Sequence, residues 1–161
     1  MTRIGLIATF ALAVCGGPAA ADEVSTDRHA GYYYPAPESS ETYTARVDKL
    51  ADSDRNRRIG FVTVLTTELL NRNYQPTYAI FAKGDEGEKL IIVGSMDGQL
   101  DTVYRARALF ATLTAVARMT PVFQSMPEAD RLTFFDLLKM LGFQQVTISD
   151  GVGFAHQVFI E

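Results

Sequence analysis

The stretch TYAIFAKGDEGEKLIIVG, residues 77–94, decides the fold. It consists of two runs rich in β-branched and aromatic residues, which flank a turn of glycine and acidic residues at Gly84–Glu88. This pattern predicts an antiparallel β-hairpin. Because the second run contains the unbroken apolar segment Leu90–Val93, we expect its strand to be covered on both faces and to lie in the middle of a sheet.

A second hairpin is predicted near the C-terminal end. Gln145–Ser149 and Phe154–Ile160 are rich in strand-forming residues, and the turn sequence Asp150–Gly153 separates them. A further strand is expected over Thr42–Val47, where polar and apolar residues alternate. A short helix that reaches Leu50 is the alternative for this last segment.

Three segments have the spacing of amphipathic helices, at residues 54–71, 101–119 and 128–142. Ser53 is the expected cap of the first helix. The apolar stripe of that helix is formed by Ile59, Val62, Leu65, Leu69 and Leu70.

Hairpins and amphipathic helices each have an apolar face that they cannot bury alone. We therefore predict an α+β fold: a mainly antiparallel sheet of four or five strands, formed by two β-hairpins and an N-terminal strand and covered by about three amphipathic helices. Residues 41–161 would form this single domain. Residues 22–161, which include this domain and the segment before it, make a chain of about 140 residues. A chain of that length buries roughly two-thirds of its unfolded surface, which is enough for stability without disulfides.

The first 21 residues have the organisation of a secretory signal peptide. Arg3 precedes the apolar run Ile4–Val14, and Ala19–Ala21 forms a small-residue cleavage site. The run is shorter than the ~20 residues that span a bilayer. We therefore expect an exported, periplasmic protein that begins at Asp22.

Two other interpretations of this leader stay open. Leu12–Cys15 resembles a lipoprotein box, in which Cys15 is lipidated and anchors the protein to a membrane, although Val14 stands where the box has a small residue. Alternatively, the apolar run is a buried first strand, and Gly16–Gly17 belongs to a loop that faces a phosphate.

The composition excludes several classes of partner and chemistry. The 161 residues include 19 acidic and 15 basic side chains, with a formal charge of −4 and a pI of about 5.2. We therefore expect no basic surface for nucleic acid. The single cysteine, Cys15, excludes an intrachain disulfide framework, and cleavage after Ala21 would also remove any cysteine nucleophile.

Residues 22–40 are polar and contain two prolines, so we expect an extended arm. Three consecutive tyrosines, Tyr32, Tyr33 and Tyr34, lie in this arm. Exposed aromatic rings are unfavourable unless they pack against something. The tyrosines are therefore expected either to lie over their own domain or to anchor a partner protein.

Arg55, Arg57 and Arg58 gather at the start of the first predicted helix. Positive charge there opposes the helix dipole by a few tenths of a kcal/mol to about 1 kcal/mol for each residue. Either nearby aspartates neutralise the cluster, or it binds an acidic partner, an anionic lipid surface or a carboxylate ligand.

Patterns for catalysis are weak. The histidines are His29 and His156. In the predicted C-terminal hairpin His156 lies within reach of Ser149 and Asp150, which would give a Ser–His–Asp set for a small hydrolase. No Gly-x-Ser-x-Gly motif surrounds Ser149, and a strand histidine that pairs across the sheet is the simpler interpretation.

No metal or cofactor is expected. The segment Asp52–Asn56 imitates the start of a calcium loop, but Arg57 and Thr63 occupy the positions that require glycine and glutamate. Two distant histidines without a thiolate do not make a usual zinc site. The acidic residues of the first hairpin are typical of a solvated turn.

At His29–Pro35, Tyr78–Gly84, Tyr104–Leu109 and Phe134–Phe143 the chain resembles a group of short exported bacterial proteins of unknown role. Some of these proteins are labelled molybdopterin-guanine dinucleotide biosynthesis protein A, which implies a nucleotidyltransferase. That family has a Leu-Ala-Gly-Gly loop after its first strand. The only Gly-Gly pair of this chain is Gly16–Gly17, which precedes a proline, so no catalytic residue is carried over.

These patterns favour a non-catalytic periplasmic binding or accessory module that contacts another envelope protein. Its partner-binding residues would be Tyr32–Tyr34 and the arginines at 55, 57 and 58. The alternative is a small enzyme, either a hydrolase around His156 or a molybdopterin-guanine dinucleotide nucleotidyltransferase. Membrane contact is expected only if Cys15 is lipidated, and the sequence leaves the oligomeric state open.

Overall fold

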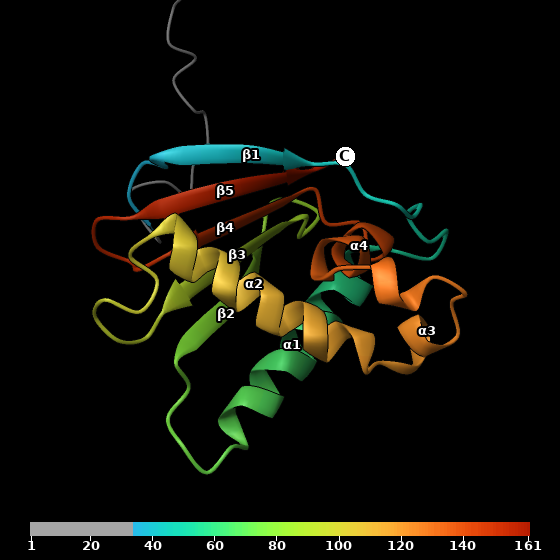
Figure 1. Cartoon of the computed structure of the whole chain (residues 1–161), viewed down its shortest axis with the longest axis horizontal. Helices are drawn as coiled ribbons and strands as arrows, with labels where there is room; N and C mark the ends of the chain where they lie inside the picture. The colour runs from blue at the N-terminus through green and yellow to red at the C-terminus, as the bar shows by residue number, and fades with distance from the viewer. Residues whose placement is uncertain (1–33) are drawn as a thin grey trace, which may run out of the picture.

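The computed structural model describes residues 34–161. They form a five-stranded sheet with α1, α2 and α4 on one face (Figure 1). The strands are β1 (Ser39–Tyr43), β2 (Tyr78–Lys83), β3 (Lys89–Gly94), β4 (Gln145–Ser149) and β5 (Ala155–Ile160). The helices are α1 (Arg55–Leu70), α2 (Val103–Arg118), α3 (Pro121–Gln124) and α4 (Phe134–Met140), with a short 3-10 turn at Ala129–Arg131.

The α+β class is confirmed, but the sheet is mixed, so the prediction of a mainly antiparallel sheet is wrong. Both predicted hairpins, β2–β3 and β4–β5, are antiparallel. The pairs β3–β4 and β1–β5 are parallel, and the strand order is β1-β5-β4-β3-β2. A tight turn forces antiparallel pairing only within a hairpin. The connection between β3 and β4 contains helices and is long enough for β4 to run beside β3 in the same direction.

The apolar run of β3 is covered on both sides, as predicted. Leu90 and Ile92 belong to the main core beneath the helices, and both have no exposed surface. Ile91 points to the opposite face, where it packs with Tyr34 and Ala155 in a smaller buried cluster. This strand is therefore the apolar centre of the molecule.

Helix α1 begins close to its predicted start, but with a different cap. The side chain of Asp54 accepts a hydrogen bond from the Arg57 amide at 2.8 Å. The hydroxyl of Ser53 instead donates to the carbonyl of Leu50. An aspartate at the N-cap also supplies negative charge at the positive end of the helix dipole.

The helix predicted from residue 128 starts later, at Phe134. Thr133 and Asp136 form a capping box there, which satisfies backbone N–H groups that the first turn leaves without partners. Asp136 has no exposed surface and also accepts hydrogen bonds from the Tyr43 hydroxyl and the Arg46 amide, both at 2.8 Å. These bonds tie the end of β1 to α4.

The N-terminal strand lies earlier than the predicted Thr42–Val47. It begins at Ser39, inside the segment that was expected to be an arm, and ends at Tyr43. In the parallel pairing with β5, Tyr43 lies opposite Ile160, the last residue of that strand. The strand therefore stops where its pairing partner stops.

Candidate functional site

The predicted arginine cluster does not form one exposed surface. Arg58 is 3 % exposed, and its guanidinium donates to the Glu86 carbonyl from Nε at 2.9 Å and from Nη2 at 2.7 Å. Its Nη1 also lies 3.4 Å from the carbonyl oxygens of Ser53 and Leu141. The expectation that Arg58 contacts a partner is corrected accordingly: its side chain lies in the interior and fixes α1 to the β2–β3 turn.

The other two arginines remain at the surface. Arg57 forms an ion pair with Asp52, which matches the interpretation that nearby aspartates neutralise the cluster. Arg55 is exposed at the first position of α1. Neither residue lies near Tyr34, which is buried on the face of the sheet opposite the helices. Tyr32, Tyr33 and the predicted leader, including Cys15, lie outside the described residues.

The edge of the sheet at β2 has an open row of backbone groups. β2 is the last strand in the order, and no strand of the described chain pairs with its outer side. The Ser95 amide donates to the Thr77 carbonyl at 2.8 Å, so Thr77 and Ser95 form a hydrogen-bonded pair just before β2 and just after β3. This pair fixes which residues of β2 direct their backbone N–H and C=O groups toward β3. Because hydrogen-bonded and non-hydrogen-bonded pairs alternate along two antiparallel strands, the backbone groups of Tyr78, Ile80 and Ala82 point away from β3.

An apolar groove of about 270 Å³ runs beside this edge, between β2 and the C-terminal end of α1. Leu70, at the end of the helix, is 67 % exposed, unlike the rest of the predicted stripe. None of the lining residues carries a charge. They are Thr66, Leu69, Leu70, Gln75, Pro76, Tyr78, Ala79, Ile80, Phe81 and Ser95.

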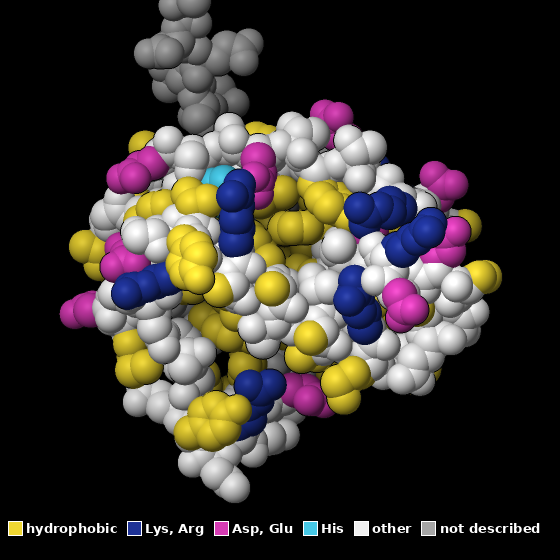
Figure 2. Space-filling view, viewed as in Figure 1, with side chains coloured by type: hydrophobic (Ala, Val, Ile, Leu, Met, Phe, Trp, Pro, Cys, Tyr) yellow, Lys and Arg dark blue, Asp and Glu magenta, His cyan; other side chains and the backbone are white. Residues whose placement is uncertain are grey.

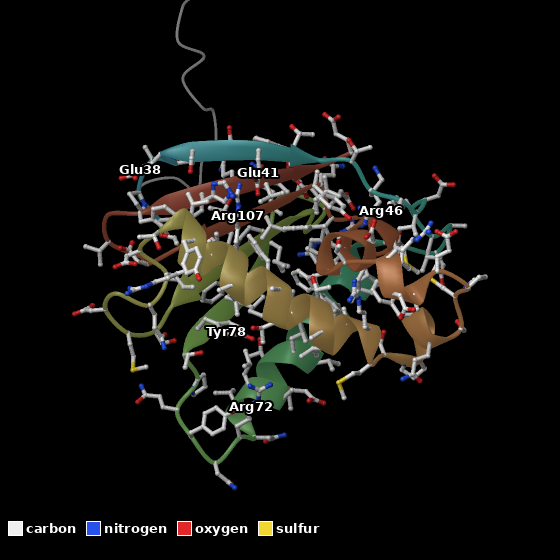
Figure 3. All side chains as sticks on the ribbon, viewed as in Figure 1. Glu38, Glu41, Arg46, Arg72, Tyr78 and Arg107 are labelled. Carbon is white, nitrogen blue, oxygen red and sulfur yellow. The ribbon has the colours of Figure 1, made fainter. Side chains whose placement is uncertain are left out.

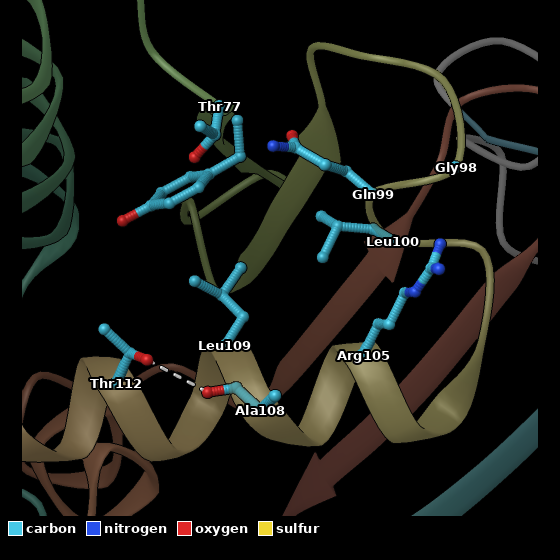
Figure 4. Close-up of a pocket in the computed structure, with 9 residues that line it drawn as sticks. Thr77, Gly98, Gln99, Leu100, Arg105, Ala108, Leu109 and Thr112 are labelled. Atoms are coloured by element: carbon cyan, nitrogen blue, oxygen red, sulfur yellow. Dashed lines mark hydrogen bonds between the residues drawn. The ribbon is translucent and has the colours of Figure 1, made fainter. Parts of the chain in front are cut away.

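A second hollow of about 520 Å³ lies on the other side of Tyr78. Figure 4 shows Arg105, Leu109 and Thr112 of α2 across from the loop that carries Gln99. The Arg105 guanidinium already pairs with Asp101 at 2.8 Å. In the space-filling view this face is hollowed between α1 and α2, with hydrophobic side chains inside (Figure 2).

Tyr78 separates the two hollows and remains a neutral hydrogen-bond donor. Burial raises the pKa of its phenol above the ordinary value, and the positive charge of Arg72 only partly opposes that shift. Figure 3 shows Arg72 at the end of α1, on the same side of the sheet as Tyr78. Arg72 also lies over the ring of Tyr74, 5.9 Å from its centroid. Tyr74 itself is 62 % exposed and adds aromatic surface at this end of α1.

His156 lies on β5, next to the opposite edge strand β1, but not with the predicted partners. In the β4–β5 register Ser149 pairs with Ala155 and His156 pairs with Ile148. Because neighbouring residues of a strand point to opposite faces, Ser149 lies on the other face from His156. The His156 ring instead meets two residues of β1, Ser39 and Glu41.

Metal and membrane features are absent within residues 34–161. That part of the chain contains no group of three His, Cys, Asp or Glu side chains placed to hold a metal ion. It also contains no helix with the length and apolar character needed to cross a membrane.

Neither the groove nor the partners of His156 were predicted from the sequence. The signal for the groove was the absence of charge between Tyr78 and Ala82, which is unusual for an edge strand. The sequence did not show, however, that this strand lies at an edge. Comparison of the chain with protein-family models, with curated proteins and with solved structures gives no match.

Proposed function

We propose that this protein is a binding module that holds an extended segment of a partner protein along the outer edge of β2. The observation that carries the proposal is an edge strand whose one charge, Lys83, lies at its last residue, beside a groove lined by uncharged residues. Proteins ordinarily protect exposed strand edges with charges, prolines or bulges. β2 has none of these between Tyr78 and Ala82 and has a charge only at its last residue, Lys83, so the rest of the strand is suited to pairing with another chain.

The geometry fits recognition by strand addition. In that mode an incoming segment forms main-chain hydrogen bonds with an open edge, and its alternate side chains enter pockets beside the strand. The outward backbone groups of Tyr78, Ile80 and Ala82 supply the first element, and the groove along α1 supplies the second. Its volume is below the roughly 300–1,000 Å³ typical of small-molecule sites and suits a few apolar side chains. Such binding makes and breaks no covalent bond.

We place this binding in the periplasm, with an envelope protein as the partner. The support is the organisation of the first 21 residues, which predicts export and cleavage before Asp22. The mass and N-terminal residue of the native protein test this part. A chain starting at Asp22 supports a released periplasmic module, a lipidated Cys15 makes it a membrane-anchored one, and an intact Met1 contradicts export.

Peptide selection tests the binding site itself. A phage library of random dodecapeptides is panned on the purified protein, and the dissociation constants of the enriched peptides are measured for two variants. Leu70→Asp places a charge in the groove, whereas Val64→Asp places it on the same helix, at a side chain that is 59 % exposed and does not line the groove. A leucine side chain that the bound peptide buries contributes about 1.5–3 kcal/mol to binding. Leu70→Asp should therefore weaken binding by at least tenfold. Val64→Asp should leave it unchanged.

Amide hydrogen exchange separates strand addition from simple contact with the groove. Bound peptide should slow the exchange of the Ile80 and Ala82 amides, which face the open edge. Protection confined to α1 would contradict strand addition, and equal binding by the two aspartate variants would contradict the groove. If the protein instead forms a concentration-dependent dimer through β2, with no peptide enriched, the occupant of the edge is a second copy and the proposal fails.

Of the two enzyme alternatives, only the one around His156 gains support from geometry. The nucleotidyltransferase hypothesis rests on the resemblance alone. The partners of His156 lie at the other edge of the sheet from the groove, so the two sites are independent.

A further inference from the structure

His156 lies between a hydroxyl and a carboxylate at the β1 edge. Its Nδ1 is 2.8 Å from the Ser39 Oγ, and its Nε2 is 3.4 Å from the Glu41 Oε1. The Arg107 Nη2 reaches the other carboxylate oxygen of Glu41 at 2.8 Å. Figure 3 shows Arg107 extending from α2 toward Glu41 on β1. The parallel register places Ser39 directly beside His156, which explains how residues so distant in sequence meet.

The charges around the ring favour one tautomer of His156. Burial would raise the pKa of Glu41, but the hydrogen bond from Arg107 and the nearby ring of His156 outweigh it and lower that pKa below its ordinary value. Glu41 is therefore ionised at neutral pH. An ionised carboxylate opposite Nε2 favours the proton on that nitrogen, which leaves the Nδ1 lone pair to accept a hydrogen bond from the Ser39 hydroxyl.

This arrangement satisfies the general signature of an activated nucleophile. A hydroxyl lies within hydrogen-bonding distance of a base, and a third group orients the base. His156 is 2 % exposed, and its Nε2 has no hydrogen-bond partner within the described structure. A buried polar atom in that state costs about 1–3 kcal/mol and calls for an explanation, of which a catalytic role is one.

We propose that Ser39 is a nucleophile activated by His156, with Glu41 as the positioning residue, and that the site accepts small uncharged carboxylic esters. Oγ attacks the ester carbonyl carbon while Nδ1 takes the hydroxyl proton. The C–O bond to the alcohol then breaks, and the alcohol leaves with that proton. Water hydrolyses the acyl-serine by the same proton route in reverse.

The charges and exposure of the site argue for this substrate class. Ser39 is half-buried, and the side chains of Glu41 and Arg107 are 36 % and 63 % exposed, so the site borders solvent. The charge of Glu41 is already balanced by Arg107, and the exposed Glu38 adds a further carboxylate beside the strand (Figure 3). This balance disfavours anionic esters.

The test uses an alkyl fluorophosphonate on the purified full chain. In the labelling step the Oγ–P bond forms, the P–F bond breaks, fluoride leaves and the hydroxyl proton passes to Nδ1. Tandem mass spectrometry should find the adduct on Ser39. The matched control is Ser40, the next residue on the strand, which is exposed and points to the opposite face. Labelling should persist in Ser40→Ala and disappear in Ser39→Ala.

Further variants separate catalysis from packing. His156→Gln should slow labelling by at least about a hundredfold, the lower end of what a general base contributes. Glu41→Gln should slow it by about tenfold or more, whereas Glu41→Asp, which keeps the charge, should restore most of the rate at an unchanged unfolding midpoint. If His156→Gln does not fold, Ser39→Ala and Ser40→Ala still test whether Ser39 is the labelled nucleophile. Absence of an adduct at Ser39 in the wild-type chain, or wild-type labelling in a folded His156→Gln, would overturn the proposal.

Discussion

The two edges of the sheet are built in opposite ways. The β1 edge carries polar and charged side chains, and its Glu41 pairs with Arg107 and faces His156. The β2 edge has its one charge, Lys83, at the end of the strand, and the uncharged segment Tyr78–Ala82 borders an apolar groove. Charge on an edge strand opposes pairing with other chains. The difference indicates that the β1 edge, with Glu41 in the middle of its strand, is less suited to a further strand than the β2 edge, where the charge lies at the end.

The helices produce this difference. Helix α2 lies close enough to β1 for Arg107 to reach Glu41. Helix α1 is held to the β2–β3 turn at its N-terminal half by Arg58, and its C-terminal end leaves the groove beside β2. One helix therefore covers its edge with charge, while the other forms the wall of a groove.

The largest expected effect comes from breaking the attachment of α1. Arg58→Met removes the donors to the carbonyls of Glu86, Ser53 and Leu141. Each buried acceptor without a donor costs about 1–3 kcal/mol, so we expect the free energy of unfolding in urea to fall by about 3 kcal/mol. The matched control is Arg57→Met, at a side chain that is 39 % exposed, which should change it by no more than about 0.5 kcal/mol. Equal effects would contradict the interior role of Arg58.

Much of the fold was predictable because it follows from local patterns. The hairpin at residues 77–94 and α2 were both identified from residue spacing, and both are confirmed. The mixed character of the sheet was not predictable, because it depends on how β4 returns beside β3 after the helices. Local patterning specifies elements, whereas the direction of pairing between distant strands is decided by the packing of the whole chain.

The candidate sites were less predictable for the same reason. The sequence identified His156 as the histidine worth attention but assigned it Ser149, which the pleat of β5 and β4 places on the other face. Its partner Ser39 is 117 positions away, and only the β1–β5 register brings the two together. Arg58 was mispredicted for a related reason. Its position in the sequence suggested an exposed side chain on a helix, but the guanidinium is buried and donates hydrogen bonds to backbone carbonyls of three other segments.

A smaller effect is expected from a substitution in the first half of α1, away from the groove. Gly60 lies within α1, and a Cβ added there would meet no atom within 4 Å. Glycine in a helix interior costs about 0.5–1 kcal/mol relative to alanine. Gly60→Ala should therefore raise the free energy of unfolding by about that amount, measured in urea. Gly142→Ala is the contrasting substitution, since its φ is +81° and its Cβ would lie 2.7 Å from Arg58 Nη1; it should destabilise the protein. Loss of stability in both variants would contradict a regular helix at Gly60.

The smallest effect concerns the charge of the β1 edge. Burial alone would raise the pKa of Glu41, but the hydrogen bond from Arg107 and the nearby ring of His156 lower it below its ordinary value of 4.5. A carboxyl group with a lowered folded-state pKa stabilises the protein above the unfolded-state pKa, and that contribution is lost as pH falls through the folded-state value. The difference in unfolding free energy between the wild-type protein and Glu41→Gln should therefore be largest near neutral pH and shrink below pH 4.5.

The size of this change is limited because the Glu41 side chain is 36 % exposed and solvent screens its ion pair. Local hydrogen exchange makes it measurable, since amides of β1 should lose protection at acidic pH in the wild-type protein before amides of β2 do. In Glu41→Gln the two edges should respond to pH alike, because the group that distinguishes them no longer titrates. If β2 loses protection first, or if the difference between wild type and variant grows as the pH falls, the charged contact of Glu41 does not stabilise the β1 edge.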